Sequence, residues 1–407
     1  MHSMMRSRLA HLLLAAVALA LTCGVATAGP KVYVGNFKDN TVSVLDAAAG
    51  AVVATVPVAA GPHGMGITPD DRWVYVSGDS SSTLSVIDTT TDRVVQSIEV
   101  GKTPHGVALT RDGRLLLVAV YGEDRIAFVD TATRAVVGTV RVAKPHTIAI
   151  RPDGKVAYVA SQEPGRFELA VIDLAARAVV RTVALDKAPR DLEFGHDGKA
   201  LYFTQAGVNA VQVLDPASDK IVAEIATGVS PHYANFFRGT TLGMAVVQGP
   251  GELLLFDPAT NQPLRSIGVG KQPHWLTVSG NGKNAYVTNE GSNDVSVVDL
   301  ATGKTATIAV GNAPRKVVVQ SATGGVKVSI ANFAFVPPLI TIAPGDSVTW
   351  SNDDGAPHAV AFKDGAAGPA SMSPGQTFRR VFDRAGSHEY FCSFHPYMAG
   401  RVVVRAQ

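Results

Sequence analysis

A proline-led segment recurs seven times in the first 320 residues, and it constrains the fold more than any other feature of the chain. The first copy, "PHGMGITPDDRWVYVSG", begins at Pro62, and successive copies begin 41 to 44 residues apart. The other copies begin at Pro104, Pro145, Pro189, Pro231, Pro273 and Pro314. Such a period, with four short apolar runs in each repeat, is typical of the four-stranded blades of a β-propeller. The sequence therefore predicts an all-β fold.

The two ends of the repeat region complement each other. Residues 31–56 supply only the last three strands of a blade, and "PRKVVVQ" from Pro314 supplies only the first. Joined, they complete a seventh blade and close the ring, which leaves few exposed strand edges. We expect a seven-bladed propeller over residues 29–320, a linker at 321–325 and a second domain at 326–407.

One repeat carries a family resemblance. "AYVTNEGSNDVSVVDLATGKT", residues 285–305, resembles the units of the YVTN family of bacterial β-propellers, and the resemblance extends over about residues 31–320. It implies the propeller fold but no particular activity, because propellers host many unrelated functions.

Residues 1–28 have the features of an export signal. Arg6 and Arg8 precede an apolar run that is too short to span a bilayer, and small residues at 26–28 offer a cleavage site. Lipid attachment at Cys23 is the alternative. We expect cleavage and a periplasmic or secreted protein whose mature chain has no membrane span.

Charge and motifs exclude several function classes. Two of the 36 lysines and arginines lie in the signal, so the remainder balances the 34 acidic residues, which argues against nucleic-acid binding. The chain has no Ser-His-Asp constellation, P-loop or Rossmann fingerprint, and no CxxCH motif for covalent haem.

The C-terminal segment "YFCSFHPYMAG" concentrates metal-binding side chains. Cys392, His395 and Met398 are spaced C-x2-H-x2-M, and His358 precedes the cysteine by 34 residues. Copper that cycles between two oxidation states is bound by a thiolate, two imidazoles and a weak axial thioether. Period-2 alternation of apolar residues predicts that a small antiparallel sandwich carries these ligands. The alternative is a buried cysteine with unrelated histidines and a core methionine.

This segment resembles the blue copper proteins, or cupredoxins, and "CSFHPYM" is most similar to the amicyanin and plastocyanin group. The resemblance implies one type 1 copper ion and single-electron transfer with a redox partner, which would be a cytochrome, a cupredoxin or an enzyme. It also implies that Asn352 braces the cysteine loop. A dinuclear copper centre is excluded because the mature chain has no second cysteine.

Five histidines follow the repeat prolines at the start of the innermost strands, where they should ring the mouth of the channel. They are His63, His105, His146, His232 and His274, with Arg190 and Arg315 in the other two blades. The second strands should bring four acidic residues to the same face, namely Asp79, Glu123, Glu163 and Glu290. The ring is either a second metal site beside arginines that attract a small anionic substrate, or a turn preserved by repetition.

A propeller followed by a cupredoxin resembles nitrous oxide reductase, although this chain has five ring histidines instead of seven and one cysteine in the cupredoxin. Two functions follow: an electron carrier with the propeller as docking scaffold, or a copper oxidoreductase that acts at the ring. Catalytic candidates in the second case are Arg190, Arg315, Glu163 and Glu290. The linker should leave the propeller on the face opposite the ring. The copper domain must therefore fold back, or serve the ring of a neighbouring chain in a head-to-tail homodimer.

Overall fold

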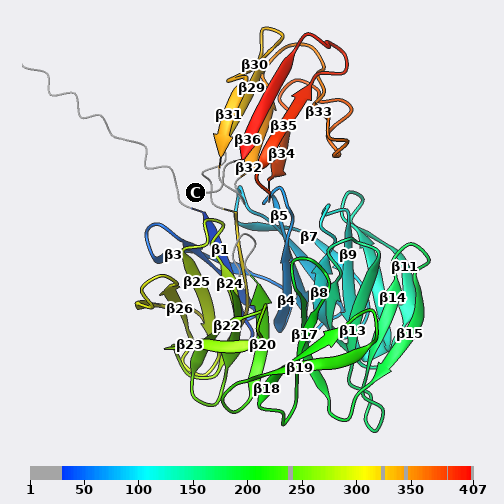
Figure 1. The fold of residues 1–407 in the computed structure, drawn as a ribbon, viewed down its shortest axis with the longest axis vertical. Coiled ribbons are helices and arrows are strands. Elements are labelled where there is room, and N and C mark those ends of the chain that lie inside the picture. The colour runs from blue at the N-terminus through cyan, green and yellow to red at the C-terminus, as the bar shows by residue number, and fades with distance from the viewer. Residues whose placement is uncertain (1–29, 237–241, 322–325, 343–346, 383, 405–407) are drawn as a thin grey trace, which may run out of the picture.

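The computed structural model describes residues 30–236, 242–321, 326–342, 347–382 and 384–404. Seven four-stranded sheets form the larger part of the molecule, and two further sheets form a smaller domain on one face of it (Figure 1). The single helical segment in these ranges is η1, Tyr121–Glu123, and none of their helices has the length and apolar character to cross a membrane. The expected signal peptide and linker positions 322–325 lie outside the described residues.

Each large sheet runs from an innermost strand at the channel to an outermost strand at the rim. The first is β28 (Pro314–Val319), β1 (Lys31–Asn36), β2 (Thr41–Asp46) and β3 (Ala51–Pro57). The second is β4 (Pro62–Ile67), β5 (Trp73–Gly78), β6 (Thr83–Asp88) and β7 (Arg93–Glu99). The third is β8 (Pro104–Leu109), β9 (Leu115–Val120), β10 (Arg125–Asp130) and β11 (Ala135–Arg141). The fourth is β12 (Pro145–Ile150), β13 (Val156–Ser161), β14 (Glu168–Asp173) and β15 (Ala178–Ala184).

Three more blades complete the circle. The fifth is β16 (Pro189–Phe194), β17 (Leu201–Gln205), β18 (Ala210–Asp215) and β19 (Lys220–Ala226). The sixth is β20 (Pro231–Phe236), β21 (Gly243–Val247), β22 (Glu252–Asp257) and β23 (Gln262–Gly268). The seventh is β24 (Pro273–Val278), β25 (Asn284–Asn289), β26 (Asp294–Asp299) and β27 (Thr305–Ala309).

The ring closes as the sequence predicts. β28 pairs antiparallel with β1, with Val32 opposite Val319 and Val34 opposite Val317. Each innermost strand contacts the innermost strand of the next blade, and β28 contacts both β24 and β4. The predicted seven-bladed propeller with one-plus-three closure is confirmed.

Sequence patterns explain the layers within a blade. The second and third strands are buried almost throughout, since neighbouring blades cover both of their faces, whereas outer strands such as β7 alternate between exposed and covered positions. An aspartate begins the turn into the outer strand in every blade and accepts backbone N–H bonds, as Asp130 does from Thr133 at 2.7 Å. This Asx geometry fixes the hairpin and hence the register.

The smaller domain is a sandwich of two four-stranded sheets. One sheet consists of β30 (Ala334–Val336), β29 (Val326–Ala331), β32 (Ser347–Asn352) and β34 (Thr377–Val381). The other consists of β31 (Leu339–Ile342), β36 (Ala399–Val404), β35 (Gly386–Phe391) and β33 (Ala361–Phe362). The prediction of an antiparallel sandwich was wrong in part, since β29 pairs parallel with β32 and β31 pairs parallel with β36, and alternation of apolar residues does not distinguish the two directions. Aromatic side chains of both sheets fill the space between them, with Trp350 edge-on to Tyr390 at 5.1 Å between ring centroids. The domain therefore has its own hydrophobic core.

The two domains meet at the β4–β5 turn. Asp71 in this turn forms an ion pair with Arg379 of β34 and accepts a hydrogen bond from the backbone N–H of Ser321 at 3.0 Å. The turn lies at the end of β4 away from Pro62, and hence on the propeller face opposite the histidines. The smaller domain thus sits on the face where the linker was expected to emerge.

Candidate metal centre

A tight loop between β35 and β36 carries three of the predicted ligands. The Cys392 N–H bonds to the Met398 carbonyl at 3.1 Å, and the Met398 N–H bonds to the His395 carbonyl at 2.9 Å. These bonds fold the loop back on itself, and Cys392 and Met398 are both buried. Cysteine, histidine and methionine are therefore held together by backbone geometry.

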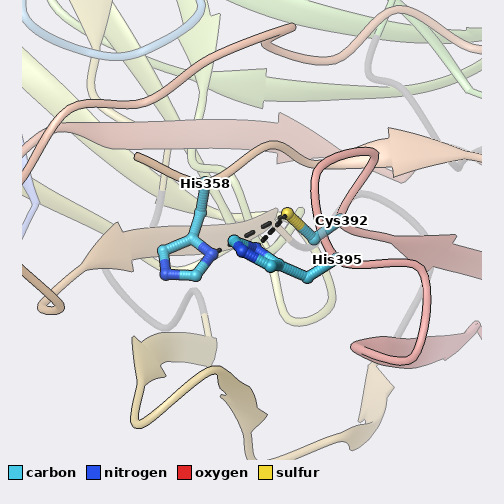
Figure 2. A group of neighbouring side chains, drawn as sticks. All are labelled: His358, Cys392 and His395. Atoms are coloured by element: carbon cyan, nitrogen blue, oxygen red, sulfur yellow. Dashed lines mark hydrogen bonds between the residues drawn. The ribbon is translucent and has the colours of Figure 1, made fainter. Parts of the chain in front are cut away.

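The fourth predicted ligand comes from the loop after β32. His358 is fully buried, and its backbone pairs with Met372 through an isolated bridge. The imidazole Nδ1 points toward the cysteine sulfur, as Figure 2 shows. Two segments far apart in sequence thus converge on one point.

The distances between donor atoms fit a copper site. Cys392 Sγ lies 3.7 Å from His358 Nδ1 and 3.6 Å from His395 Nδ1, and all three atoms lie within 4.8 Å of one another. Trigonal ligands about 2.0 Å (nitrogen) and about 2.3 Å (sulfur) from a shared ion are separated by about 3.7 Å. No comparable group of histidine, cysteine or acidic side chains occurs elsewhere among the described residues.

The sulfur and one imidazole have additional partners. The Ala359 N–H donates to Cys392 Sγ at 3.3 Å, which stabilises a thiolate. His358 Nε2 bonds to Asp354 Oδ2 at 2.9 Å, and the Asp354 carboxylate also accepts from the backbone N–H groups of Asn332 and Phe333. These backbone bonds, followed by the His358 bond, lower the pKa of Asp354. The carboxylate therefore fixes the orientation of the His358 ring and leaves Nδ1 for the metal.

Asn352 has a different role from the one that the resemblance implied. Its side-chain amide donates to the carbonyls of Ala356 and Met372, at 2.9 and 2.8 Å, and its Oδ1 accepts from the Asp354 N–H. Asn352 therefore braces the loop that carries His358 and the Met372 segment that pairs with it, and not the cysteine loop.

An exposed apolar surface surrounds the partly exposed His395. Phe333 lies edge-on to His358 and His395, with centroid distances of 5.2 and 4.9 Å, and is 42% exposed. Phe394 and Tyr397 of the cysteine loop are 52% and 73% exposed. Phe333 belongs to the turn between β29 and β30, which Figure 1 places at the end of the domain far from the propeller. The donor cluster therefore faces away from the propeller.

The structure brings the five ring histidines together. Ring centroids are 3.7 Å apart for His63 and His105, 4.0 Å for His105 and His146, and 4.1 Å for His232 and His274. His105 and His146 direct Nδ1 to the backbone carbonyls of the next blade, at 3.1 and 2.8 Å. Burial lowers the pKa of every ring histidine. No three of their ligand nitrogens form a group as close as the one around Cys392.

The arginines of the ring have partners nearby. Arg315 pairs with Glu290 at 3.0 Å, and Glu290 lies 3.9 Å from His274 Nε2. Arg190 donates to the Ser230 hydroxyl at 2.9 Å.

The other acidic candidates differ in their surroundings. Asp79 is partly buried, and burial raises its pKa. Glu123 is exposed, pairs with Arg125 at 2.8 Å and accepts a hydrogen bond from the backbone N–H of Lys102 at 2.9 Å. The charge of Glu163 adds a small part to the rise in the pKa of Lys144, which comes mainly from the hydrogen bond to Asp124. Of the four catalytic candidates, only Arg315 and Glu290 form a pair with each other.

The two domains match two different families of known proteins. Residues 322–405 match the family described as copper binding proteins, plastocyanin/azurin family, and residues 10–114 match the YNCE-like beta-propeller family. Among solved structures, Kuenenia stuttgartiensis hydrazine synthase covers 67% of this chain with a TM-score of 0.62 and 21% identity. The match covers 92% of that chain, and at this identity it shows the propeller fold alone.

Curated relatives match the smaller domain. Amicyanin-alpha of Methylorubrum extorquens is 36% identical over 24% of this chain and 87% of its own length. Amicyanin of Paracoccus versutus is 39% identical over 19% of this chain, which spans 64% of that relative. Plastocyanin of Tetradesmus obliquus is 38% identical over 17% of this chain and 58% of its own length. Through its C-terminal domain, the chain belongs to the plastocyanin/azurin family of copper-binding proteins.

Proposed function

We propose that this chain is an exported single-electron carrier. His358, Cys392, His395 and Met398 would hold one type 1 copper ion, and the propeller is a docking scaffold. The observation that carries the proposal is the convergence of three donor atoms within 4.8 Å beside an exposed apolar surface. Copper held there supplies a one-electron couple.

The surrounding residues suit this role. Buried, hydrogen-bonded ligands change position little between oxidation states, which favours fast electron exchange. His395 is the ligand nearest to solvent, and Phe333, Phe394 and Tyr397 offer a surface that sheds water when a partner docks. The partner is a redox protein: a cytochrome, another cupredoxin or an enzyme.

Electron exchange tests the docking surface. We expect Phe394→Ser to slow the oxidation of the reduced protein by ferric cytochrome c at least tenfold, with an unchanged reduction potential, because the substitution removes exposed apolar area. Stopped-flow absorbance measures the rate. Val222→Ser is the control, since Val222 is 61% exposed on β19 of the propeller. Equal rates for both variants would contradict docking at the copper end.

A second candidate is a copper oxidoreductase with another metal at the ring of His63, His105, His146, His232 and His274. The close imidazole contacts favour it, as does the Arg315–Glu290 pair beside them. The chain's own copper domain contacts the opposite face, so a neighbouring chain in a head-to-tail dimer would have to deliver electrons. Two or more copper ions per chain would support this candidate over the carrier.

A further inference from the structure

The two sides of the channel differ in the size and charge of the side chain at one repeat position, the second residue after each proline. Three consecutive blades have small residues there, namely Gly64, Gly106 and Thr147. The other four have larger or charged residues, namely Asp191, Tyr233, Trp275 and Lys316.

The asymmetry opens a cavity of about 270 Å³ in the channel. Its small-residue wall includes Gly106, Ala108 and Ala149, and its opposite wall is formed by the four large residues with Glu193. Arg111 lines both this cavity and the groove between the propeller and the copper domain. Ligand pockets usually measure roughly 300–1,000 Å³, so this one suits a molecule of few atoms.

The large wall is held in a fixed arrangement. Tyr233 and Trp275 stack at 3.5 Å between ring centroids, and the Lys316 ammonium lies 3.0 Å from the Trp275 centroid. The Tyr233 hydroxyl donates to Glu193 at 3.0 Å and accepts from the Asn235 amide at 2.6 Å. The wall is therefore preorganised without a ligand.

Two opposite charges in this wall attract each other but form no direct ion pair. Asp191 is 2% exposed, and its Oδ2 has no hydrogen-bond partner among the described residues. Lys316 lies over the rings of Tyr233 and Trp275, and among the described residues it forms no ion pair with Asp191. Burial raises the pKa of Asp191 and lowers that of Lys316 to about 8, and the attraction between the two charges offsets these shifts only in part. An unpaired buried carboxylate is costly, and a bound group that donates to it would remove the cost.

The charge of the walls limits what that group can be. Arg151 pairs with Asp153, whereas Asp191 and Lys316 stand in the large wall as opposite charges that form no direct ion pair with each other. A charged ligand would therefore be attracted by one of the Asp191 and Lys316 side chains and repelled by the other.

We propose that this cavity binds a small neutral molecule whose head group donates a hydrogen bond to Asp191 and accepts one from Lys316. A short aliphatic primary carboxamide is the simplest such molecule, with its NH₂ on Asp191 Oδ2, its carbonyl oxygen on Lys316 Nζ and its tail along Ala108 and Ala149. This site is separate from the copper centre and from the histidine ring.

Isothermal titration of the copper-loaded full chain with three four-carbon probes tests the proposal. We expect butyramide to bind, and butyrate and butylammonium to bind at least tenfold more weakly. Absence of butyramide binding at its solubility limit would overturn the proposal, as would equal or tighter binding of either charged probe.

Charge-changing variants give a second readout. Asp191→Asn leaves Lys316 unmatched and should shift the preference to butyrate, whereas Lys316→Gln should shift it to butylammonium. The control is Lys283→Gln, at an exposed turn position, which should leave the preference unchanged. Circular dichroism and the blue absorption establish that each variant is folded. If one variant does not fold, the other and the probe series decide, and an unchanged preference in a folded variant would overturn the proposal.

Discussion

Asp354 is the residue whose charge acts most directly on the copper ligands. Its carboxylate bonds His358 Nε2 at 2.9 Å and is itself held by two backbone N–H groups, so a negative charge is fixed one imidazole away from the metal position. A nearby negative charge favours the more positive oxidation state of a bound ion. Asp354 should therefore lower the reduction potential.

We expect Asp354→Asn to raise the potential. A tenfold shift of the one-electron equilibrium toward the reduced state corresponds to about 59 mV, which protein-film voltammetry resolves. Asp353→Asn removes the same charge one residue away, where the carboxylate bonds Ser329 and Ser351 instead of a ligand. Equal shifts for the two variants would assign the effect to general charge and not to the His358 hydrogen bond.

The buried ring histidines should make the free energy of unfolding of the propeller depend on pH. Burial lowers the pKa of His146 to about 4 and that of His232 to about 3, below the ordinary value of about 6.5. Between about pH 6.5 and 4 the unfolded chain binds protons that the folded chain does not, so the free energy of unfolding falls as the pH falls through this window. Each histidine contributes up to about 1.4 kcal/mol per pH unit.

Urea unfolding between pH 7 and pH 5 measures this dependence. The variant His146→Gln should show a shallower loss of stability than the unmodified chain, because one proton-binding group is gone. An identical pH dependence in the two proteins would mean that His146 is not buried in the folded propeller.

At the scale of elements, the β34 strand joins the copper domain to the propeller through Arg379. Both side chains of the Arg379–Asp71 pair are largely buried, at 13% and 10% exposure, and removing one partner of a buried pair costs about 3–5 kcal/mol. We expect Arg379→Ala to release the domain, which small-angle scattering would record as a larger radius of gyration.

The blue absorption of Arg379→Ala should be unchanged, since the copper ligands lie at the other end of the domain. Arg380→Ala is the matched control, because Arg380 packs against Phe362 and Phe382 within its own domain. An unchanged radius for Arg379→Ala would contradict attachment of the domain through the Arg379–Asp71 pair.

Local elements also explain where sequence reasoning succeeded and failed at the copper centre. The sequence predicts the ligands of the cysteine loop because Cys392, His395 and Met398 are close together in the chain. Asp354 is four residues before His358, yet nothing in the pattern distinguishes it from Asp353 until the loop folds. Phe333 reaches the ligands only because it occupies a left-handed turn, with φ near 56°, between β29 and β30.

At the scale of the whole molecule, repetition made the propeller predictable, since the period gives the size of a blade, the number of copies gives the blade number, and the complementary ends give the closure. The channel cavity could have been found from the same alignment, because the second residue after each proline diverges at Asp191 and Lys316. The position of the copper domain depends on the contact between Asp71 and Arg379, 308 residues apart, which no local pattern reveals. The linker at 321–325 and a metal ion bound by the ring histidines stay predictions.

Copper content per chain, with visible and electron paramagnetic resonance spectra, tests the central claim most directly. The copper-loaded protein is compared with its Cys392→Ala variant. The carrier proposal predicts one copper ion per chain with a type 1 spectrum, and loss of both colour and copper in the variant. Two or more ions per chain, with part of the copper retained after Cys392 is replaced, would contradict it and place chemistry at the histidine ring.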